Sequence, residues 1–247
     1  MSGLGPESLV VVTGAAGSAG IAVAQAISAT GARVVGAGRD LARLEAVARS
    51  LGDAAPLFTP AVVDLTDVDA VRAWAQEVGA SHPSGAPRVD GLVHLVGGYR
   101  GGARFTDTTA ADAEFLIEQL VRTLQNVTLA FHDLLIASSA SRVVIVSATA
   151  SQAPTAGNAA YASAKAAAET WTLSLADSFR REQQDGPRTA AATVLVVKAL
   201  VDDAARAAEP DRTFPGFTDV HDLAARVVDL WSSDVDAING ARIDLTL

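Results

Sequence analysis

Short, nearly continuous apolar runs alternate along the chain with longer Ala-rich segments in which apolar residues recur every three or four positions. The first pattern is typical of parallel strands buried on both faces, and the second is typical of amphipathic helices. Strands are predicted at residues 9–13, 33–38, 61–64, 91–96, 142–147, 192–197 and 241–245. Helices are predicted at residues 19–30, 41–51, 68–78, 110–138, 161–181 and 220–232. The alternation indicates βαβ units arranged around a parallel sheet.

Length and composition favour a single globular domain over residues 1–247. The chain has a mass of 25.2 kDa and a hydrophobic content of 49%, enough to fill one large α/β core. Residues 81–87, with two prolines and a glycine, separate the third helix from the fourth strand, and no comparable linker divides the chain elsewhere. No stretch approaches 18 uninterrupted apolar residues, so no membrane partner is expected.

Charge and residue content exclude several classes of function. A net charge of -9 and a pI near 4.8 provide no broad positive field for a phosphate backbone, so no nucleic-acid partner is expected. The absence of cysteine excludes disulfides and thiolate catalysis, and the four histidines show no paired metal-ligand spacing, so no metal is expected. The first residues contain no basic region followed by a long apolar run, and a cytoplasmic location is therefore expected.

A glycine-rich turn follows the first predicted strand. It runs from Thr13 through Gly14 and Gly17 to Gly20, and a predicted helix begins immediately. Free backbone N–H groups at such a helix start would face an anion, and glycine allows phosphates to approach the backbone. The alternative is a tight strand-to-helix turn without a ligand, but its position in a βαβ unit favours a nucleotide.

Candidate adenosine contacts follow the second and third strands. The second strand ends at Gly38, Arg39 and Asp40. A basic residue there suits a 2′-phosphate, whereas an acidic residue suits a free ribose hydroxyl. Arg39 therefore indicates NADP over NAD; a solvated Arg39 with Asp40 serving the ribose is the alternative. Asp64, after the third strand, is a candidate adenine contact or a cap of the next helix.

Tyr161 and Lys165 form the candidate catalytic pair. Four residues apart on a helix, they lie on one face about one turn apart. An ammonium near the phenol would lower the pKa of the tyrosine from its usual value of about 10 and would also bond a ribose hydroxyl. Taken alone, the pair favours an ordinary amphipathic helix whose Tyr and Lys are surface residues, but the preceding dinucleotide turn reverses this in favour of the catalytic interpretation.

Together, the segment Thr13 to Gly20, Asp64, and the run Tyr161 to Lys165 resemble the short-chain dehydrogenases/reductases over essentially the whole chain. The resemblance implies an α/β fold with a doubly wound, Rossmann-type parallel sheet of about seven strands and helices on both faces. It also implies an NAD or NADP cofactor, a homodimer or homotetramer, and catalysis by Tyr161 and Lys165. The cofactor-binding residues predicted on this basis are Gly14, Ala16, Ser18, Ala19, Gly20, Arg39, Asp64, Leu65, Val96, Gly97, Tyr161, Lys165 and Val201.

The chain departs from the pattern of that family at several positions. The family's active-site serine, thirteen residues before the tyrosine, corresponds to Ala148, and strand alternation turns Ser147 and Thr149 to the other face. The helix asparagine of the family corresponds to Leu120. Gln119 and Asn126 are nearby polar candidates, but each would face a different direction.

Two further residues differ at strand ends. His94 stands at the end of the fourth strand, where a core histidine satisfied by backbone groups is expected and not a catalytic one. Lys198, after the sixth strand, is a candidate for contact with cofactor phosphates or a substrate oxygen, although a solvated loop lysine is favoured. The loop from Val201 to Phe217 is a candidate lid, with Arg206, Arg212, Phe214 and Phe217 near the substrate.

The function predicted from these residues is NADP-dependent oxidoreduction, with a hydride moving between nicotinamide and a carbonyl or alcohol substrate. Tyr161 would be the acid or base, and Lys165 would hold Tyr161 and the ribose. Loss of the serine and asparagine keeps open an alternative: a catalytically silent NADP-binding protein that acts as a regulatory or partner subunit. A sugar-nucleotide epimerase is rejected because the segment after Val197 is too short for a substrate lobe.

Overall fold

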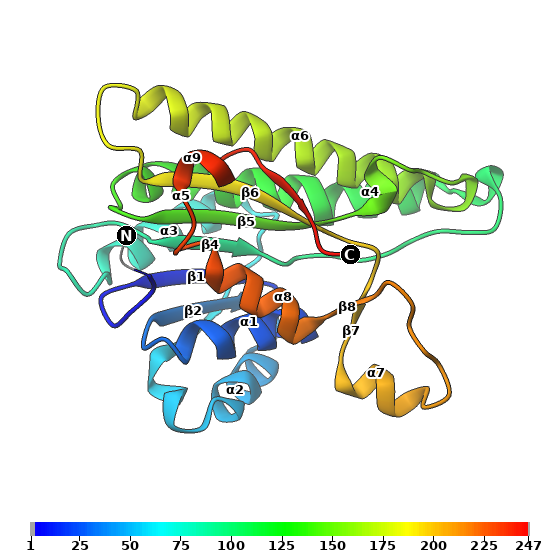
Figure 1. The fold of residues 1–247 in the computed structure, drawn as a ribbon, viewed down its shortest axis with the longest axis horizontal. Coiled ribbons are helices and arrows are strands. Elements are labelled where there is room, and N and C mark those ends of the chain that lie inside the picture. Colours follow the sequence, from blue (N-terminus) through cyan, green and yellow to red (C-terminus); the bar gives the residue numbers. More distant parts are fainter. Residues whose placement is uncertain (1–2, 247) are drawn as a thin grey trace.

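The computed structural model describes residues 3–246 and is built on a seven-stranded sheet (Figure 1). Its strand order is β3-β2-β1-β4-β5-β6-β9, and every neighbouring pair is parallel. The strands are β1 (Leu9–Thr13), β2 (Arg33–Gly38), β3 (Phe58–Val62), β4 (Gly91–His94), β5 (Ser141–Ala148), β6 (Ala190–Val197) and β9 (Arg242–Asp244). The order reverses between β1 and β4, and ligands of open parallel sheets bind outside the strand ends at such a point.

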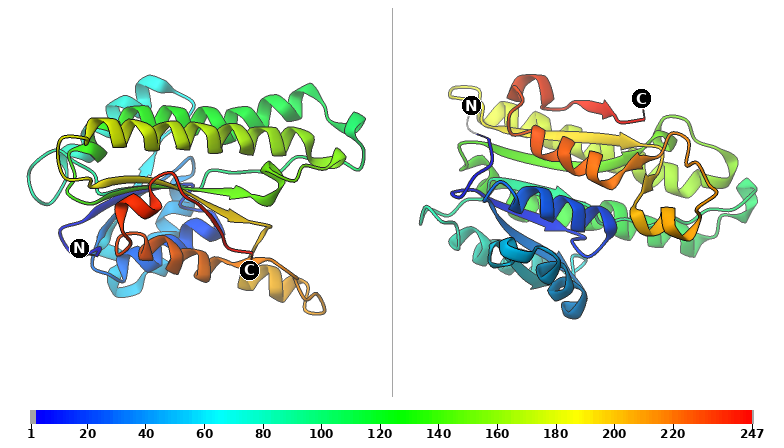
Figure 2. Two further views of the ribbon diagram at one scale, coloured as in Figure 1. Left: turned by 45° about the horizontal axis from the view of Figure 1, so that its top comes forward. Right: turned by 60° about the horizontal axis from the view of Figure 1, so that its bottom comes forward.

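Helices cover both faces of the sheet (Figures 1 and 2). One face carries α1 (Ser18–Ser28), α2 (Leu41–Ser50) and α8 (Val220–Asp229), and the other carries α3 (Val68–Ala80), α5 (Thr123–Ile136) and α6 (Ala159–Glu182). Strand alternation accounts for the two layers, because Val10 and Val12 enter one core whereas Leu9 and Val11 enter the other. The doubly wound α/β fold expected from the sequence is confirmed.

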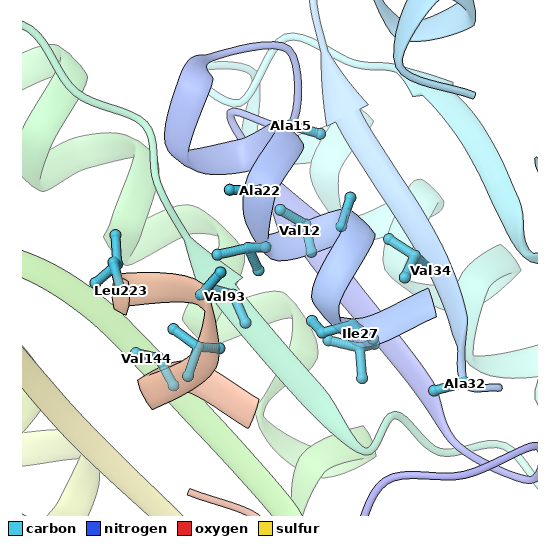
Figure 3. Packing of buried hydrophobic residues seen from close by; sticks show 14 of the residues in the cluster. Val12, Ala15, Ala22, Ile27, Ala32, Val34, Val93, Val144 and Leu223 are labelled. Atoms are coloured by element: carbon cyan, nitrogen blue, oxygen red, sulfur yellow. The ribbon is translucent and has the colours of Figure 1, made fainter. Parts of the chain in front are cut away.

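The core between the sheet and α1 and α8 is made of closely packed aliphatic side chains (Figure 3). Val12, Val93 and Val144 come from three neighbouring strands and lie with Ile27 of α1 and Leu223 of α8. All five are fully buried. Burial of an aliphatic side chain of this size stabilises a fold by roughly 1.5–3 kcal/mol, so this layer fixes the glycine turn that lies between β1 and α1.

The third strand was predicted in the wrong place, at residues 61–64 instead of Phe58–Val62. The observed strand contains Pro60, which has no N–H group to donate to a ladder. It is tolerated because β3 is an edge strand that pairs with β2 alone. Phe58 is buried against the core and anchors the strand that the sequence pattern places too late.

The long helix predicted over residues 110–138 is interrupted. It consists of α4 (Ala110–Ile117), a π-helical turn (Glu118–Arg122) and α5. At the junction the Thr123 hydroxyl donates to the carbonyl of Gln119 at 2.6 Å, which offers that carbonyl a partner outside the regular helix ladder. The fourth strand is also shorter than predicted and ends at His94, so residues 95 and 96 begin the loop to α4.

The segment from Val201 to Phe217 is not entirely a loop. It contains α7 (Asp203–Ala208), whose N-cap Asp202 accepts a hydrogen bond from the backbone N–H of Ala205 at 2.7 Å. A two-stranded ladder of β7 (Leu200–Val201) and β8 (Thr218–Asp219) closes the segment, and α9 (Val235–Ile238) precedes β9. Across residues 3–246, no helix is long and apolar enough to cross a bilayer, and no three potential metal ligands cluster.

Candidate cofactor and catalytic site

A cavity of about 410 Å³ opens at the carboxyl ends of β1, β2, β3 and β4. This is the size range of small-molecule and cofactor sites. Its walls come from the end of β2, from the loops that follow the four strands, from the first turn of α2, and from the junction of the π-helical turn with α5. The lining residues are Gly14, Ala16, Gly17, Ala37, Gly38, Arg39, Asp40, Arg43, Val63, Asp64, Leu65, Thr66, Leu95, Val96, Gly97, Gln119 and Thr123.

The glycine turn leaves backbone open to the cavity. Gly14 has a φ of 73°, and a Cβ there would lie 2.8 Å from the Leu95 carbonyl group. A side chain at Gly20 would meet the backbone of Gly14 and Ala15, so this glycine serves the packing of α1 against the turn. Gly17 is the N-cap of α1 and provides no side-chain cap, which leaves the helix N–H groups free for an anion. The turn therefore fits a pyrophosphate.

Two arginines stand at the rim beyond β2. Arg39 lines the cavity as expected, and Arg43, which sequence reasoning missed, lines it one turn into α2. The Arg43 guanidinium donates to the carbonyl of Ala16 at 2.8 Å and so bridges α2 to the glycine turn. Asp40 is the N-cap of α2 and accepts from the backbone N–H of Arg43 at 3.2 Å. The rim thus presents two cations while the adjacent carboxylate is held by the helix start.

Asp64 lines the cavity and does not cap the next helix. Its carboxylate accepts from the Thr66 backbone N–H at 2.9 Å and from the Thr66 hydroxyl at 2.7 Å, and these bonds lower the pKa of Asp64. Asp67 caps α3 instead. Asn126 of α5 donates to the carbonyl of Leu65 at 2.9 Å and fixes this loop from behind. The structure therefore excludes the cap, and the adenine contact remains a prediction for Asp64.

Tyr161 and Lys165 lie on α6 beside the carboxyl end of β5. The Lys165 ammonium donates to the Val146 carbonyl at 2.8 Å and lies 5.8 Å from the centre of the Tyr161 ring. Burial lowers the pKa of Lys165 to about 8, partly offset by Glu169. The expected lowering of the tyrosine pKa is wrong for this state: burial, and then the neighbouring Tyr99, raise the pKa of Tyr161.

The last residue of β5, Ala148, carries no hydroxyl. Ala148 is buried and apolar, whereas the Ser147 hydroxyl donates to Glu169 Oε1 at 2.5 Å. The Ser151 hydroxyl lies 2.8 Å from the Ala148 carbonyl and 2.6 Å from the same Glu169 oxygen. Both serine hydroxyls are therefore engaged with the α6 carboxylate.

His94 is a buried core histidine held by hydroxyls instead of the backbone groups that were expected. Its ring nitrogens lie 2.8 Å from Thr13 Oγ1 and 3.3 Å from Thr123 Oγ1. Burial lowers its pKa to about 3, with the Lys165 charge adding to the effect, so the ring is neutral at physiological pH. Leu120 is buried within the π-helical turn and contributes no polar group.

The structure divides the predicted cofactor residues into two sets. Seven of them line the cavity: Gly14, Ala16, Arg39, Asp64, Leu65, Val96 and Gly97. Six do not: Ser18, Ala19 and Gly20 form the first turn of α1, Tyr161 and Lys165 are on α6, and Val201 is in β7.

Ten lining residues are not among the predicted cofactor-binding residues, although Gly17, Asp40 and Gln119 were considered for other roles or as alternatives. Arg43 and Thr123 are polar lining residues that sequence reasoning missed. Arg43 lies in the first turn of the helix that begins directly after Arg39 and Asp40, and a second basic residue so close to the strand end could have identified it.

Lys198 does not line the cavity. Its ammonium donates to the Pro215 carbonyl at 3.0 Å and lies 5.8 Å from the centre of the Phe217 ring. The Arg212 guanidinium stacks on Phe214 and Phe217, at 4.8 and 5.3 Å from their ring centres. The exposed Lys198 therefore holds the loop that precedes β8 instead of projecting freely into solvent.

The chain belongs to the short chain dehydrogenase family, whose sequence profile matches residues 8–184. It is 32% identical over 177 residues to the probable oxidoreductase EphD of Mycobacterium tuberculosis, covering 71% of this chain and 28% of EphD. It is 31% identical over 168 residues to serine 3-dehydrogenase of Agrobacterium fabrum, covering 67% of this chain and 64% of that enzyme. The chain thus spans less than two thirds of the length of either relative.

Solved structures share the fold over nearly the whole chain. A short chain oxidoreductase from Pseudomonas aeruginosa PAO1, bound to NADPH and described as containing an atypical catalytic center, has a TM-score of 0.83 at 20% identity, covering 98% of this chain and 96% of that protein. A metagenomic short-chain oxidoreductase in complex with NADP has a TM-score of 0.76 at 25% identity, with 100% of both chains covered. These similarities confirm the fold.

Proposed function

We propose that this protein is an NADP-dependent oxidoreductase that transfers a hydride between nicotinamide and a carbonyl or alcohol substrate. The observation that carries the proposal is the cavity with a glycine-lined wall and a basic rim, together with Tyr161 and Lys165 on α6, where Lys165 bonds the carbonyl of Val146 near the end of β5. The NADP- and NADPH-bound proteins of the same fold support the choice of cofactor.

The residues of the cavity fit a phosphorylated dinucleotide. The free N–H groups at the start of α1 would bind the pyrophosphate. Arg39 and Arg43 would pair with the 2′-phosphate, for which a guanidinium is well suited, and Asp64 would accept from the adenine amine. When bound, the cofactor supplies or accepts the hydride.

The catalytic pair would manage the proton. Because its pKa is raised, Tyr161 is protonated at neutral pH and can donate to the oxygen of a carbonyl during reduction. Lys165 would bond the nicotinamide ribose, and its charge would favour the phenolate that remains. Ala148 provides no second donor to that oxygen, which predicts slow turnover.

Two assays test this function. Calorimetric titration should show NADPH binding, and a broad screen of activated carbonyls should show weak reduction that Tyr161→Phe lowers by about 10²–10⁴-fold. Retained NADPH affinity in that variant is the control. Activity that survives the loss of the phenol would refute the mechanism.

The buried Ala148 and Leu120 favour a second candidate, a cofactor-binding protein without turnover. NADPH binding without any turnover in the screen, including in Ala148→Ser, would establish this candidate over the enzyme. The cytoplasmic location and the single-domain organisation remain predictions.

We further infer a symmetric oligomer built on α5 and α6. A shallow apolar hollow lies between these helices, lined by Thr128, Leu129, His132, Trp171, Ser174, Leu175 and Ser178. Leu129 is 66% exposed and Leu173 is 45% exposed on the same helices. Large aliphatic side chains that face water on adjacent helices fit a two-fold contact with a second copy.

A further inference from the structure

Glu169 is a buried carboxylate one turn beyond Lys165 on α6. Its exposed fraction is 8%. Arg242, on the edge strand β9, donates to Glu169 Oε2 at 3.1 Å. The hydroxyls of Ser147 and Ser151 lie 2.5 and 2.6 Å from Oε1. Both carboxylate oxygens therefore have hydrogen-bond or ion-pair partners, as a buried carboxylate requires.

Glu169 and Lys165 form hydrogen bonds with consecutive residues of strand β5. Lys165 donates to the backbone carbonyl of Val146, and Glu169 accepts from the side chain of Ser147. The four-residue spacing on α6 places the two charged groups on one helix face. A line of charges therefore runs from Arg242 through Glu169 to Lys165, along the end of β5 and up to the catalytic tyrosine.

We propose that Glu169 is a positioning residue, which together with Arg242 sets the charge of Lys165 and holds the end of β5 against α6. The ammonium is buried, and Glu169 is the carboxylate that favours its charged form. Arg242 acts in the opposite sense, because it neutralises part of the field of Glu169 and adds a cation. The role of Glu169 in catalysis rests on the proposed function, but its effect on Lys165 does not.

Two titratable groups near Lys165 carry no charge at neutral pH. On its own helix Tyr161 is neutral at physiological pH because its pKa is raised. On β4, His94 is neutral because burial lowers its pKa to about 3. Tyr99 contacts the Tyr161 ring from the loop after β4. Glu169 is the charged group that acts directly on the ammonium, and Arg242 is the cation paired with Glu169.

The chain allows a direct test, because Lys165 and Lys198 are its two lysines. Protein carrying carbon-13 at lysine Cε gives two side-chain signals in NMR, and Lys198→Arg assigns them. Glu169→Gln should lower the proton affinity of Lys165 by about tenfold, and Arg242→Gln should raise it. Asp177→Asn removes an exposed carboxylate farther along α6 and should change nothing.

Shifts of the Lys165 pKa in opposite directions in the two variants indicate an electrostatic role. If only packing were lost, the direction of the shift would not depend on the sign of the charge that was removed. An unchanged Lys165 titration in Glu169→Gln, or shifts in the same direction, would overturn the proposal. If Glu169→Gln does not fold, Arg242→Gln decides alone, and Arg242→Lys should restore the original value. The titration needs no substrate, so a lack of turnover would count against the proposed function and not against this inference.

The rate profile adds a catalytic readout. In the reductive direction, the alkaline limb of kcat/KM should move to lower pH in Glu169→Gln and to higher pH in Arg242→Gln. If the pKa of Lys165 shifts in the variants but this limb does not move, Glu169 affects the charge of Lys165 but has no role in catalysis. That outcome would contradict the catalytic part of the proposal.

Discussion

Tyr99 and Tyr161 meet edge to face, with ring centroids 5.1 Å apart and ring planes inclined by 67°. They are the two tyrosines of the chain and come from the loop after β4 and from α6. Burial raises the pKa of Tyr161, and Tyr99 raises it further because two phenolates so close would repel each other. The contact therefore extends to higher pH the range in which Tyr161 is protonated, the form that the proposed carbonyl reduction needs.

Replacing Tyr99 by Phe should lower the pKa of Tyr161 towards its ordinary value while leaving it above that value. The ring contact is kept, but the repulsion between the two oxygens is lost, and burial remains. The measurement is a pH titration by NMR of tyrosine labelled with carbon-13 at Cζ, in which the variant has a single signal. Phe105→Leu, an exposed aromatic in the same loop, is the control. An unchanged Tyr161 titration in Tyr99→Phe would contradict the role of the contact.

Arg39 and Arg43 should both select NADPH over NADH. Both residues line the cavity rim, and the Arg43 guanidinium donates a hydrogen bond to the carbonyl of Ala16. Arg39→Ala and Arg43→Ala should each weaken NADPH binding by about 10–100-fold, the worth of a hydrogen bond to a charged group, without changing NADH binding. Calorimetric titration checks this, with the exposed Arg49→Ala of α2 as control. Equal losses for both cofactors would show that these residues do not read the 2′-phosphate.

The sequence pattern predicts the sheet well because its strands are buried on both faces. Unbroken apolar runs such as residues 9–13 and 33–38 match the observed strands residue for residue. The pattern fails at the edge strand β3, which does not have to be a continuous apolar run because it has a neighbour on one side only. In β3, Pro60 and the exposed Val62 do not look like a central strand, and only the pairing with β2 shows that they belong to one.

The candidate site is less predictable because its chemistry depends on contacts between distant segments. The spacing of Tyr161 and Lys165 is visible locally, and so is the glycine turn. The raised pKa of Tyr161 is not visible, because it depends on burial and on a tyrosine 62 positions away in the chain. The same holds for Glu169, whose partners Ser147 and Arg242 come from two other strands.

Asp90, a buried carboxylate at the amino end of β4, should contribute strongly to the free energy of unfolding. Asp90 precedes β4 and accepts from the Leu9 backbone N–H at 2.9 Å, from the Ser138 hydroxyl at 2.6 Å and from His82 Nε2 at 2.8 Å. Asp90→Ala leaves these three donors unpaired inside the protein. The free energy of unfolding should fall by about 3–5 kcal/mol.

Chemical denaturation of the variant checks the role of Asp90, read from the midpoint at an unchanged slope. Asp69→Ala, which removes a carboxylate that is 95% exposed, should change the unfolding free energy by less than about 0.5 kcal/mol. A loss at Asp90 no larger than that at Asp69 would mean that the network at the amino end of β4 adds nothing to stability.

Assembly through α5 and α6 should depend on Leu129. This side chain projects beside the hollow that Trp171 and Leu175 line, so Leu129→Glu would bury a charge in any contact formed there. The variant should be monomeric by light scattering at micromolar concentration, where the unaltered protein should be a dimer or tetramer. Leu41→Glu, a half-exposed leucine on α2, is the matched control and should assemble normally. A monomeric unaltered protein would refute the interface.

Restoring a hydroxyl at the end of β5 should raise the rate of reduction. Ala148 is buried at the end of β5, at the position where the family carries its serine, and the neighbouring Ser147 hydroxyl donates to Glu169. A preorganised donor to the developing oxyanion is worth about 2.7–4 kcal/mol, so Ala148→Ser should recover part of 10²–10³-fold in kcat. Steady-state kinetics with an activated carbonyl measure the gain, and Ala150→Ser in the following 3-10 turn is the control.

The gain must also depend on the phenol. In Ala148→Ser combined with Tyr161→Phe, the added hydroxyl can stabilise charge but cannot replace the proton donor, so the rate should fall to that of Tyr161→Phe alone or close to it. NADPH affinity should be equal in all three variants, because neither residue lines the dinucleotide cavity. If Ala148→Ser changes nothing while Tyr161 remains essential, another group stabilises the oxyanion. The Tyr99 hydroxyl is then the group to remove next, because the Tyr99 ring contacts the Tyr161 ring.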